Sequence, residues 1–314
     1  MIVQPNNINS FNHNTIYIII YSHLATFGDL LAEVRILKST VPTRTVLEGG
    51  GFPVRRPIPM SALTSPFLLL DEMGPVEWPP NGAIGAPNHP HRGFETVTYL
   101  LQGRMNHADS AGNSGELNPG DVQWMTAGRG VIHSELPHPD FKREGGVMHG
   151  FQIWVNLPAA DKMMQPRYQD VAAEEIPIVT SEDGLVEVRV IAGQSLGQSA
   201  IIDTVIPITY LHMTLKPGGK ITQSIEKGLN GMIYCFSGRL NIEDRTLNDG
   251  QLGLLSDGEE VCLSVSESAR EDVNLLVLAG PQIDETIARY GPFVMNTEQE
   301  IMQAINDYNT GKLA

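Results

Sequence analysis

Two short motifs in the sequence bring together residue types that bind metal ions. His89-Pro90-His91 and His133-Ser134-Glu135 each place two candidate ligands two residues apart. Residues i and i+2 of a β-strand point to the same face of a sheet, so each motif predicts a pair of side chains on one face. On neighbouring strands, the two pairs would put three imidazoles and one carboxylate around a common point. Such a set suits a first-row divalent ion that keeps open positions for water or substrate.

Each motif also has a simpler interpretation. A single pair of histidines in a strand-rich chain is often a surface pair, or a pair whose hydrogen bonds are already satisfied. The second motif, which follows a glycine-rich turn, favours the metal site. Glu95 is a rival carboxylate, because it shares strand parity with His89 and His91 and could point at the same site. Pro90 lacks a backbone N–H, which predicts that its motif lies at a strand start or on an edge strand.

Other polar residues are expected to have supporting roles. His107, Asp109 and Ser110 form a cluster that we interpret as a turn-stabilising network. His149 precedes a strand and is expected to support a metal-binding histidine through that histidine's second ring nitrogen. Arg55-Arg56 is interpreted as a solvated pair.

The rest of the chain is dominated by short strand signals. β-prone segments bounded by turn residues lie at residues 97–101, 122–125, 150–155, 210–215, 231–236 and 275–278. Residues 89–105 and 224–240 align without gaps, and two glycines, a tyrosine and an arginine coincide in the alignment. This internal repeat predicts two related β-barrels in tandem.

The two ends of the chain differ from the repeat. Thr297 and Glu300 have the spacing of a capping box, which predicts a helix over residues 297–314. Residues 1–38 form an extension of unclear structure. The apolar run at residues 15–21 is far shorter than the ~20 residues that cross a bilayer. We expect the first barrel at residues 39–165 and the second at residues 166–296, with the linker near residues 158–183.

Bulk composition excludes several classes of protein. The 314 residues carry a formal net charge of −15 and no run of Lys and Arg, which argues against direct nucleic-acid binding. No segment predicts a membrane span. The two cysteines, Cys235 and Cys262, do not form a disulfide framework, so we expect a reducing compartment and a cytoplasmic protein.

The longer motifs resemble the pirin family. The resemblance covers roughly residue 39 to the end and excludes residues 1–38. It rests on residues 51–57 (GFPVRRP), 66–73 (PFLLLDEM), 88–97 (NHPHRGFETV), 107–110 (HADS), 128–135 (GRGVIHSE), 150–158 (GFQIWVNLP) and 289–297 (RYGPFVMNT).

This resemblance implies an all-β fold of two tandem cupin (jelly-roll) barrels followed by a short C-terminal helix. It also implies one Fe(II) ion, in the first barrel only, held by His89, His91, His133 and Glu135. Other divalent first-row metals could occupy the same ligands. Glu95 would then not be a ligand, although in cupins generally the glutamate of the first motif does bind metal.

The repeat supports a second barrel without metal. In the ungapped alignment His89 falls on Ser224 and His91 on Glu226. Counting on from the matched turn glycines, His133 falls on Leu263 and Glu135 on Val265. No histidine follows His212 anywhere in the chain.

Two functions from different classes follow from the resemblance. Some pirins resemble quercetinases, which open a flavonol ring with O₂, so one expectation is a dioxygenase acting on a small aromatic substrate. Glu135 would then be a ligand, a general base or both in turn. The alternative is a metal-dependent regulatory protein that binds a transcription factor or a metabolic enzyme.

Overall fold

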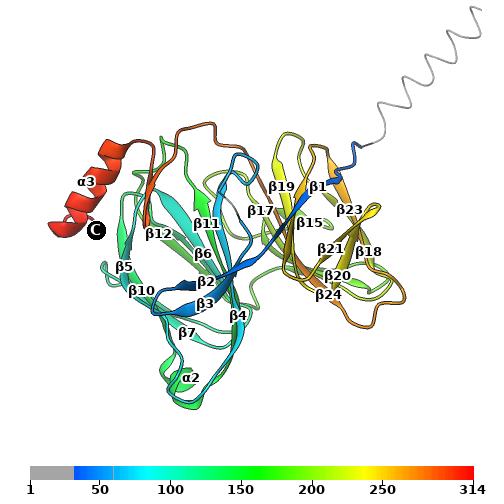
Figure 1. Ribbon diagram of the computed structural model, residues 1–314, viewed down its shortest axis with the longest axis horizontal. Helices are drawn as coiled ribbons and strands as arrows, with labels where there is room; N and C mark the ends of the chain where they lie inside the picture. The colour runs from blue at the N-terminus through cyan, green and yellow to red at the C-terminus, as the bar shows by residue number, and fades with distance from the viewer. Residues whose placement is uncertain (1–31, 59) are drawn as a thin grey trace, which may run out of the picture.

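The computed structural model describes residues 32–58 and 60–314 and contains two β-barrels side by side (Figure 1). Each barrel pairs a sheet of seven strands with a sheet of four. The expected all-β fold of two tandem jelly-roll barrels is therefore confirmed. In the described part of the chain, no helix is long and apolar enough to cross a membrane.

The first barrel contains the two candidate metal motifs. Its large sheet runs in the order β12 (Arg167–Val171), β9 (Val122–Thr126), β6 (Phe94–Gln102), β11 (Gly146–Asn156), β4 (Phe67–Trp78), β3 (Phe52–Arg56) and β2 (Arg44–Glu48). Its small sheet runs in the order β5 (Ala86–His91), β10 (Val131–Pro137), β7 (Met105–Asp109) and β8 (Ser114–Leu117). The short helix α2 (Pro139–Glu144) follows β10.

The second barrel repeats this plan. Its large sheet runs in the order β1 (Leu37–Pro42), β22 (Gln251–Leu255), β19 (Asn230–Ser237), β24 (Val273–Gly280), β17 (Thr209–Leu215), β14 (Val186–Ala192) and β13 (Ile178–Thr180). Its small sheet contains β18 (Lys220–Ser224), β23 (Glu260–Ser264), β20 (Arg239–Ile242) and β21 (Arg245–Asn248). Two short hairpins complete the strands, β15 (Gln194–Ser195) with β16 (Gln198–Ser199), and β25 (Ala288–Tyr290) with β26 (Phe293–Met295).

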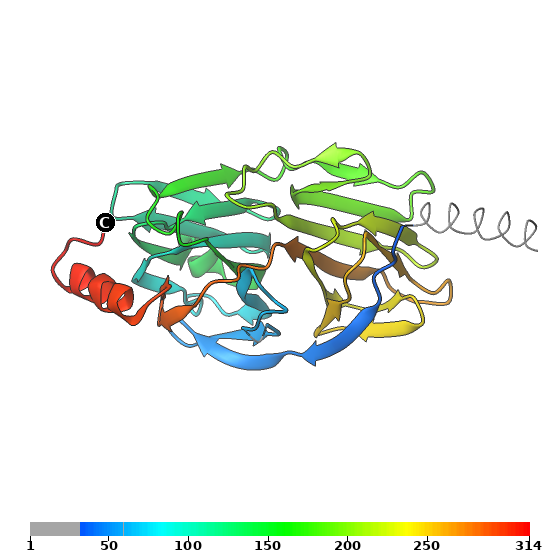
Figure 2. The same cartoon turned by 90° about the horizontal axis from the view of Figure 1, so that it is seen from above.

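Strand pairing crosses the boundaries expected from the sequence. β1 pairs with β22, so residues 37–42 belong to the large sheet of the second barrel. β12 pairs with β9, so residues 167–171 belong to the large sheet of the first. Figure 2 shows the N-terminal strands running along both barrels. Each barrel thus includes a strand whose residues were expected outside it. Residues 1–31, most of the expected N-terminal extension, lie outside the described part.

The two large sheets pack face to face and share one apolar core. Phe151 of β11 is fully buried there, and its ring centroid lies 4.9 Å from that of Phe236 and 6.4 Å from that of Tyr234. Tyr99 of β6 meets Tyr210 edge to face at 6.3 Å. Because alternate residues of a strand face opposite ways, the other face of β11 and β6 lines the interior of the first barrel.

The C-terminal segment returns from the second barrel to the first. After β24 it forms β25 and β26 and then α3 (Glu298–Asn309), which lies at the outer end of the first barrel (Figure 1). Thr297 accepts from the Glu300 backbone N–H, and the Glu300 side chain accepts from the Thr297 backbone, so the predicted capping box is confirmed.

The shared core predicts that the two barrels unfold together. The three tryptophans, Trp78, Trp124 and Trp154, lie on strands of the first barrel, so fluorescence reports that barrel while circular dichroism reports both. Phe151→Ala should lower the free energy of unfolding by about 3–5 kcal/mol, because it opens a cavity between the sheets. In urea titrations, both signals should shift together to lower denaturant.

The matched control is Val147→Ala on the same strand, at a more exposed position, which should change stability by less than about 0.5 kcal/mol. If Phe151→Ala shifts fluorescence while part of the dichroism melts unchanged, the barrels are independent and the prediction is wrong.

Candidate metal centre

The three histidines of the two motifs converge inside the first barrel. β5 carries His89 and His91, β10 carries His133, and the two strands pair so that His133 lies directly opposite His89. The ring centroids are 4.5 to 4.9 Å apart, and His89 Nε2 lies 3.0 Å from His133 Nε2. One nitrogen of each ring lies within 4.8 Å of one nitrogen of the other two. The sequence-based prediction that both pairs share one face therefore describes the histidines correctly.

Pro90 fits its place between the two histidines. β5 is the edge strand of the small sheet, with β10 as its one neighbour in that sheet. Proline is tolerated on an edge strand because no ladder hydrogen bond is lost.

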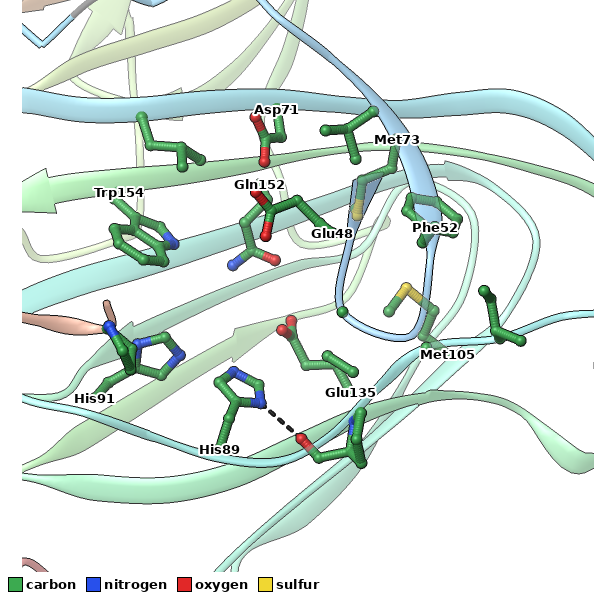
Figure 3. Close-up of a pocket in the computed structure, with 18 of the residues that line it drawn as sticks. Glu48, Phe52, Asp71, Met73, His89, His91, Met105, Glu135, Gln152 and Trp154 are labelled. Carbon is green, nitrogen blue, oxygen red and sulfur yellow. Dashed lines mark hydrogen bonds between the residues drawn. The ribbon is translucent and has the colours of Figure 1, made fainter. Parts of the chain in front are cut away.

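Glu135 lies beside the histidines, just outside their close set. Its Oε2 is 4.0 Å from His133 Nε2, and its Oε1 accepts a hydrogen bond of 2.8 Å from Thr98 Oγ1. The register of β10 against β5 shifts between His133 and Glu135. Figure 3 shows His89, His91 and Glu135 on one side of a pocket, with Gln152 and Trp154 across from them.

Glu95, the rival carboxylate, points away from this pocket. Its Oε1 accepts from Thr126 Oγ1 at 2.6 Å, and burial raises the pKa of its carboxyl group. The alternation of side chains along a strand does not continue from His91 to Glu95. β5 ends before Gly93, and the chain bends at this glycine, which has a φ of +89°. A Cβ at this glycine would lie 2.0 Å from the Val294 carbonyl oxygen, so the bend requires glycine.

The protonation of the imidazoles suits a cation. Burial, and then the neighbouring His133 and His89 rings, hold the pKa of His91 well below its usual value. Burial lowers the pKa of His133 to about 4. Both rings are therefore neutral at pH 7, and neutral imidazole is the form that binds metal.

Hydrogen bonding supports the same conclusion. His89 Nδ1 lies 2.8 Å from the Pro87 carbonyl oxygen, an acceptor, so Nδ1 donates and Nε2 is the nitrogen that faces His133. The buried Nδ1 atoms of His91 and His133 have no partner among the described residues. Converging lone pairs and unsatisfied ring nitrogens fit a bound divalent ion.

The pocket next to the histidines measures about 490 Å³. Apolar side chains form most of its wall, chiefly Phe52, Leu69, Met73, Ile84, Met105 and Met148. Arg56 lies on the wall in a bidentate ion pair with Asp71, at 2.6 Å for each contact. Trp154 also lines the pocket, with its ring centroid 5.6 Å from that of His91.

Two of the supporting roles expected from sequence are wrong. His149 is on the opposite face of β11 from the metal pocket, where its Nε2 lies 2.9 Å from Glu72 and it lines a hollow between the barrels. The Arg55-Arg56 pair is not simply solvated, because Arg55 binds the fully buried Glu72 and Arg56 binds Asp71. Successive side chains of a strand point to opposite faces of the sheet. His149 and Arg55 therefore face the second barrel, whereas Arg56 faces the pocket.

The turn-stabilising role of Asp109 is confirmed, since its carboxylate accepts from the Ala111 and Asn113 backbone N–H groups. His107 is separate from that turn. It stacks on Tyr168 at 5.7 Å, and its Nε2 lies 3.5 Å from Asp170.

Sequence reasoning missed three pocket residues. Gln152 and Trp154 alternate with the core-facing residues of β11, so period-two counting along this strand would have found them. Arg289 lies about 200 residues along the chain from His91, and no sequence signal connects it to the site.

The corresponding region of the second barrel is apolar. Val261, Leu263 and Val265 are buried in its core, and Leu263 faces Ile221 across the sheet. Within residues 32–58 and 60–314, the His89, His91 and His133 set is the only group of three or more potential ligands close enough to hold an ion.

Comparison with known proteins agrees with this architecture. The Pirin family model matches residues 51–155, and the model of the Pirin C-terminal cupin domain matches residues 210–314. A pirin-like protein of Solanum lycopersicum is 41% identical over 91% of this chain and 96% of its own length. Human pirin is 41% identical over 87% of this chain and 92% of its own length.

Among solved structures, quercetin 2,3-dioxygenase from Acinetobacter baumannii superposes with a TM-score of 0.84 at 38% identity, covering 90% of this chain and 99% of that one. With both barrels matched and the histidine cluster in the first of them, the chain belongs to the pirin family.

Proposed function

We propose that this chain is a metal-dependent oxygenase of the quercetin 2,3-dioxygenase type, which cleaves flavonol-like substrates with O₂. The observation that carries the proposal is the position of three converging imidazoles and Glu135 beside a largely apolar pocket. The name of the Acinetobacter baumannii structure supports the same activity.

One Fe(II) ion would be held by His89, His91, His133 and Glu135. The donor set of three nitrogens and one oxygen leaves positions open, as an oxygenase requires. The same ligands accept other first-row divalent ions, so the metal in a purified sample depends on availability as well as affinity.

A bound metal ion would supply Lewis-acid stabilisation of a deprotonated substrate hydroxyl. Glu135 is positioned to take the proton of that hydroxyl, and Thr98 fixes its carboxylate by a hydrogen bond at 2.8 Å. The methionine and phenylalanine walls hold a planar ring and exclude water from it. We place the protein in the cytoplasm, because Cys235 and Cys262 are both free.

The direct test is to incubate the iron-loaded protein with quercetin and follow both its absorbance and O₂ uptake. Metal-dependent loss of quercetin with O₂ consumption supports the oxygenase. Binding of quercetin without turnover contradicts it and supports instead a metal-dependent regulatory protein that acts through a protein partner.

His133→Ala should reduce metal content after reconstitution to under about a tenth of the wild-type value, because the ion loses one of its proposed imidazole ligands. The barrel should still fold, since the shared core is untouched. Metal analysis with circular dichroism measures both. His138→Ala is the control, because His138 caps α2 and does not line the pocket. Full metal content in His133→Ala would remove this residue from the site.

Glu135→Gln and Glu95→Gln should separate the two carboxylates. Glu135→Gln should weaken metal binding by more than about 10-fold and abolish O₂ uptake. Glu95→Gln should leave both near wild type, because Glu95 lies outside the histidine set and its Oε1 accepts from Thr126 instead. Metal titration and an oxygen electrode give the two readouts, and the reverse ranking would contradict the ligand assignment.

The chain should bind one metal ion. Reconstitution with excess Fe(II), followed by removal of loosely bound ions and elemental analysis, should give about one equivalent per chain. The core around Leu263 and Val265 is apolar, and among the described residues of the second barrel no group of three potential ligands lies close enough to hold an ion. Two tightly held equivalents would show that the second barrel also binds metal.

A further inference from the structure

Arg289 brings a positive charge from the C-terminal segment to the pocket of the first barrel. It lies on β25, and its guanidinium carbon is 4.8 Å from the centroid of the Trp154 ring. Since the Trp154 ring is also 5.6 Å from His91, one planar ligand lying along this tryptophan can reach from the histidines to Arg289. A stacked guanidinium keeps its N–H groups at its edge, where a carboxylate can accept from them.

This arginine has no carboxylate partner in the described part of the chain. Both carboxylates on this part of the wall, Glu48 and Asp71, form their ion pairs with Arg56. The one hydrogen bond of Arg289 is long, 3.4 Å from its Nε to the Gly291 carbonyl oxygen. Partial burial, and then the neighbouring Arg56, lower the pKa of Arg289, against a smaller opposing effect of Glu48 and Asp71. An anion placed beside it would relieve both effects.

The segment that carries Arg289 is fixed firmly to the metal-binding barrel. The next strand, β26, forms a bridge from Phe293 to Arg92, directly after His91. The buried Lys162 donates to the Gly93 carbonyl at 2.8 Å and to the Val294 carbonyl at 3.1 Å, which links the two segments.

A second anchor lies beyond the hairpin, where Arg92 donates to Asp307 of α3 at 2.8 Å. The backbone that carries Arg289 is therefore held close to one position relative to His91.

The charge of the pocket also favours an anion once a metal is bound. The charged residues that line it are two arginines and three carboxylates, namely Arg56, Arg289, Glu48, Asp71 and Glu135. Without counting the histidines they leave one net negative charge, and a divalent ion changes this to one net positive charge. A ligand that enters with a single negative charge makes the filled pocket neutral, while transfer of its hydroxyl proton to Glu135 leaves the total unchanged.

We propose that Arg289 gives the pocket a preference, among the hydroxylated aromatic substrates of the proposed oxygenase, for those that also carry a carboxylate. The hydroxyl end faces the histidines, the ring lies against Trp154 and the carboxylate accepts from Arg289. This inference rests on the proposed function in that it uses the same metal-bearing pocket, but it concerns binding and not turnover.

The test compares two probes that share one ring, 3,4-dihydroxybenzoate and its methyl ester. Both are titrated by calorimetry into the iron-loaded protein without oxygen, so that no reaction occurs. Wild type should bind the acid at least about 10-fold more tightly than the ester, as a charge-assisted pair predicts. Arg289→Gln should remove this preference by weakening the acid alone, and Arg289→Lys should retain part of it.

The control variant is Arg270→Gln, which makes the same change of charge at an exposed arginine of the second barrel that does not line the pocket. It should behave as wild type, and all variants should keep one metal ion. Equal affinity for the two probes in wild type, or equal loss for both in Arg289→Gln, would overturn the inference. A normal preference without O₂ uptake on any substrate would instead contradict the oxygenase and leave the role of Arg289 standing.

Discussion

The packing of the two large sheets against each other is the contact on which the metal pocket depends. A barrel lined by histidines, a glutamate, a glutamine and ion pairs cannot fill its interior with apolar side chains. Along β11, Phe151 and Ile153 point outward into the shared core, while Gln152 and Trp154 point into the pocket. The second barrel, whose own interior is largely apolar, supplies the surface that these outward residues need. One barrel thereby stabilises the other, whose interior is available for chemistry.

A buried polar group within this contact makes it specific. Glu72 is fully buried and accepts from Arg55, from His149 and from the Tyr234 hydroxyl, which comes from the second barrel. Arg55 also pairs with Asp249, on the turn before β22. Burying a carboxylate costs free energy unless hydrogen bonds satisfy its oxygens. If one sheet slid over the other, Glu72 would lose these bonds, so the contact favours one alignment of the sheets.

The sequence predicts those features that depend on residues close together in the chain. The histidine pairs, the capping box at Thr297 and the tandem repeat all follow from local spacing. Glu95 shows the limit of such prediction. Counting alternate residues from His91 to Glu95 assumes one continuous strand, but the chain bends at Gly93. The face to which His149 points, the partner of Arg55 and the exchange of β1 and β12 depend on which sheets stack. Arg289 reaches the pocket because the C-terminal segment crosses back from the second barrel to the first, and no local sequence pattern predicts that return.

That crossing sets the order in which the protein can be completed during its synthesis. The histidines and Glu135 leave the ribosome first, but Arg289 and Pro292, which close one wall of their pocket, follow Glu135 by more than 150 residues. Until β14, β17, β19, β22 and β24 follow, the outward face of the first large sheet has nothing to cover it. At about 5–20 residues per second, this nascent half waits many seconds with an apolar surface exposed. Metal ligands are therefore assembled locally, whereas a finished binding pocket is a property of the whole chain.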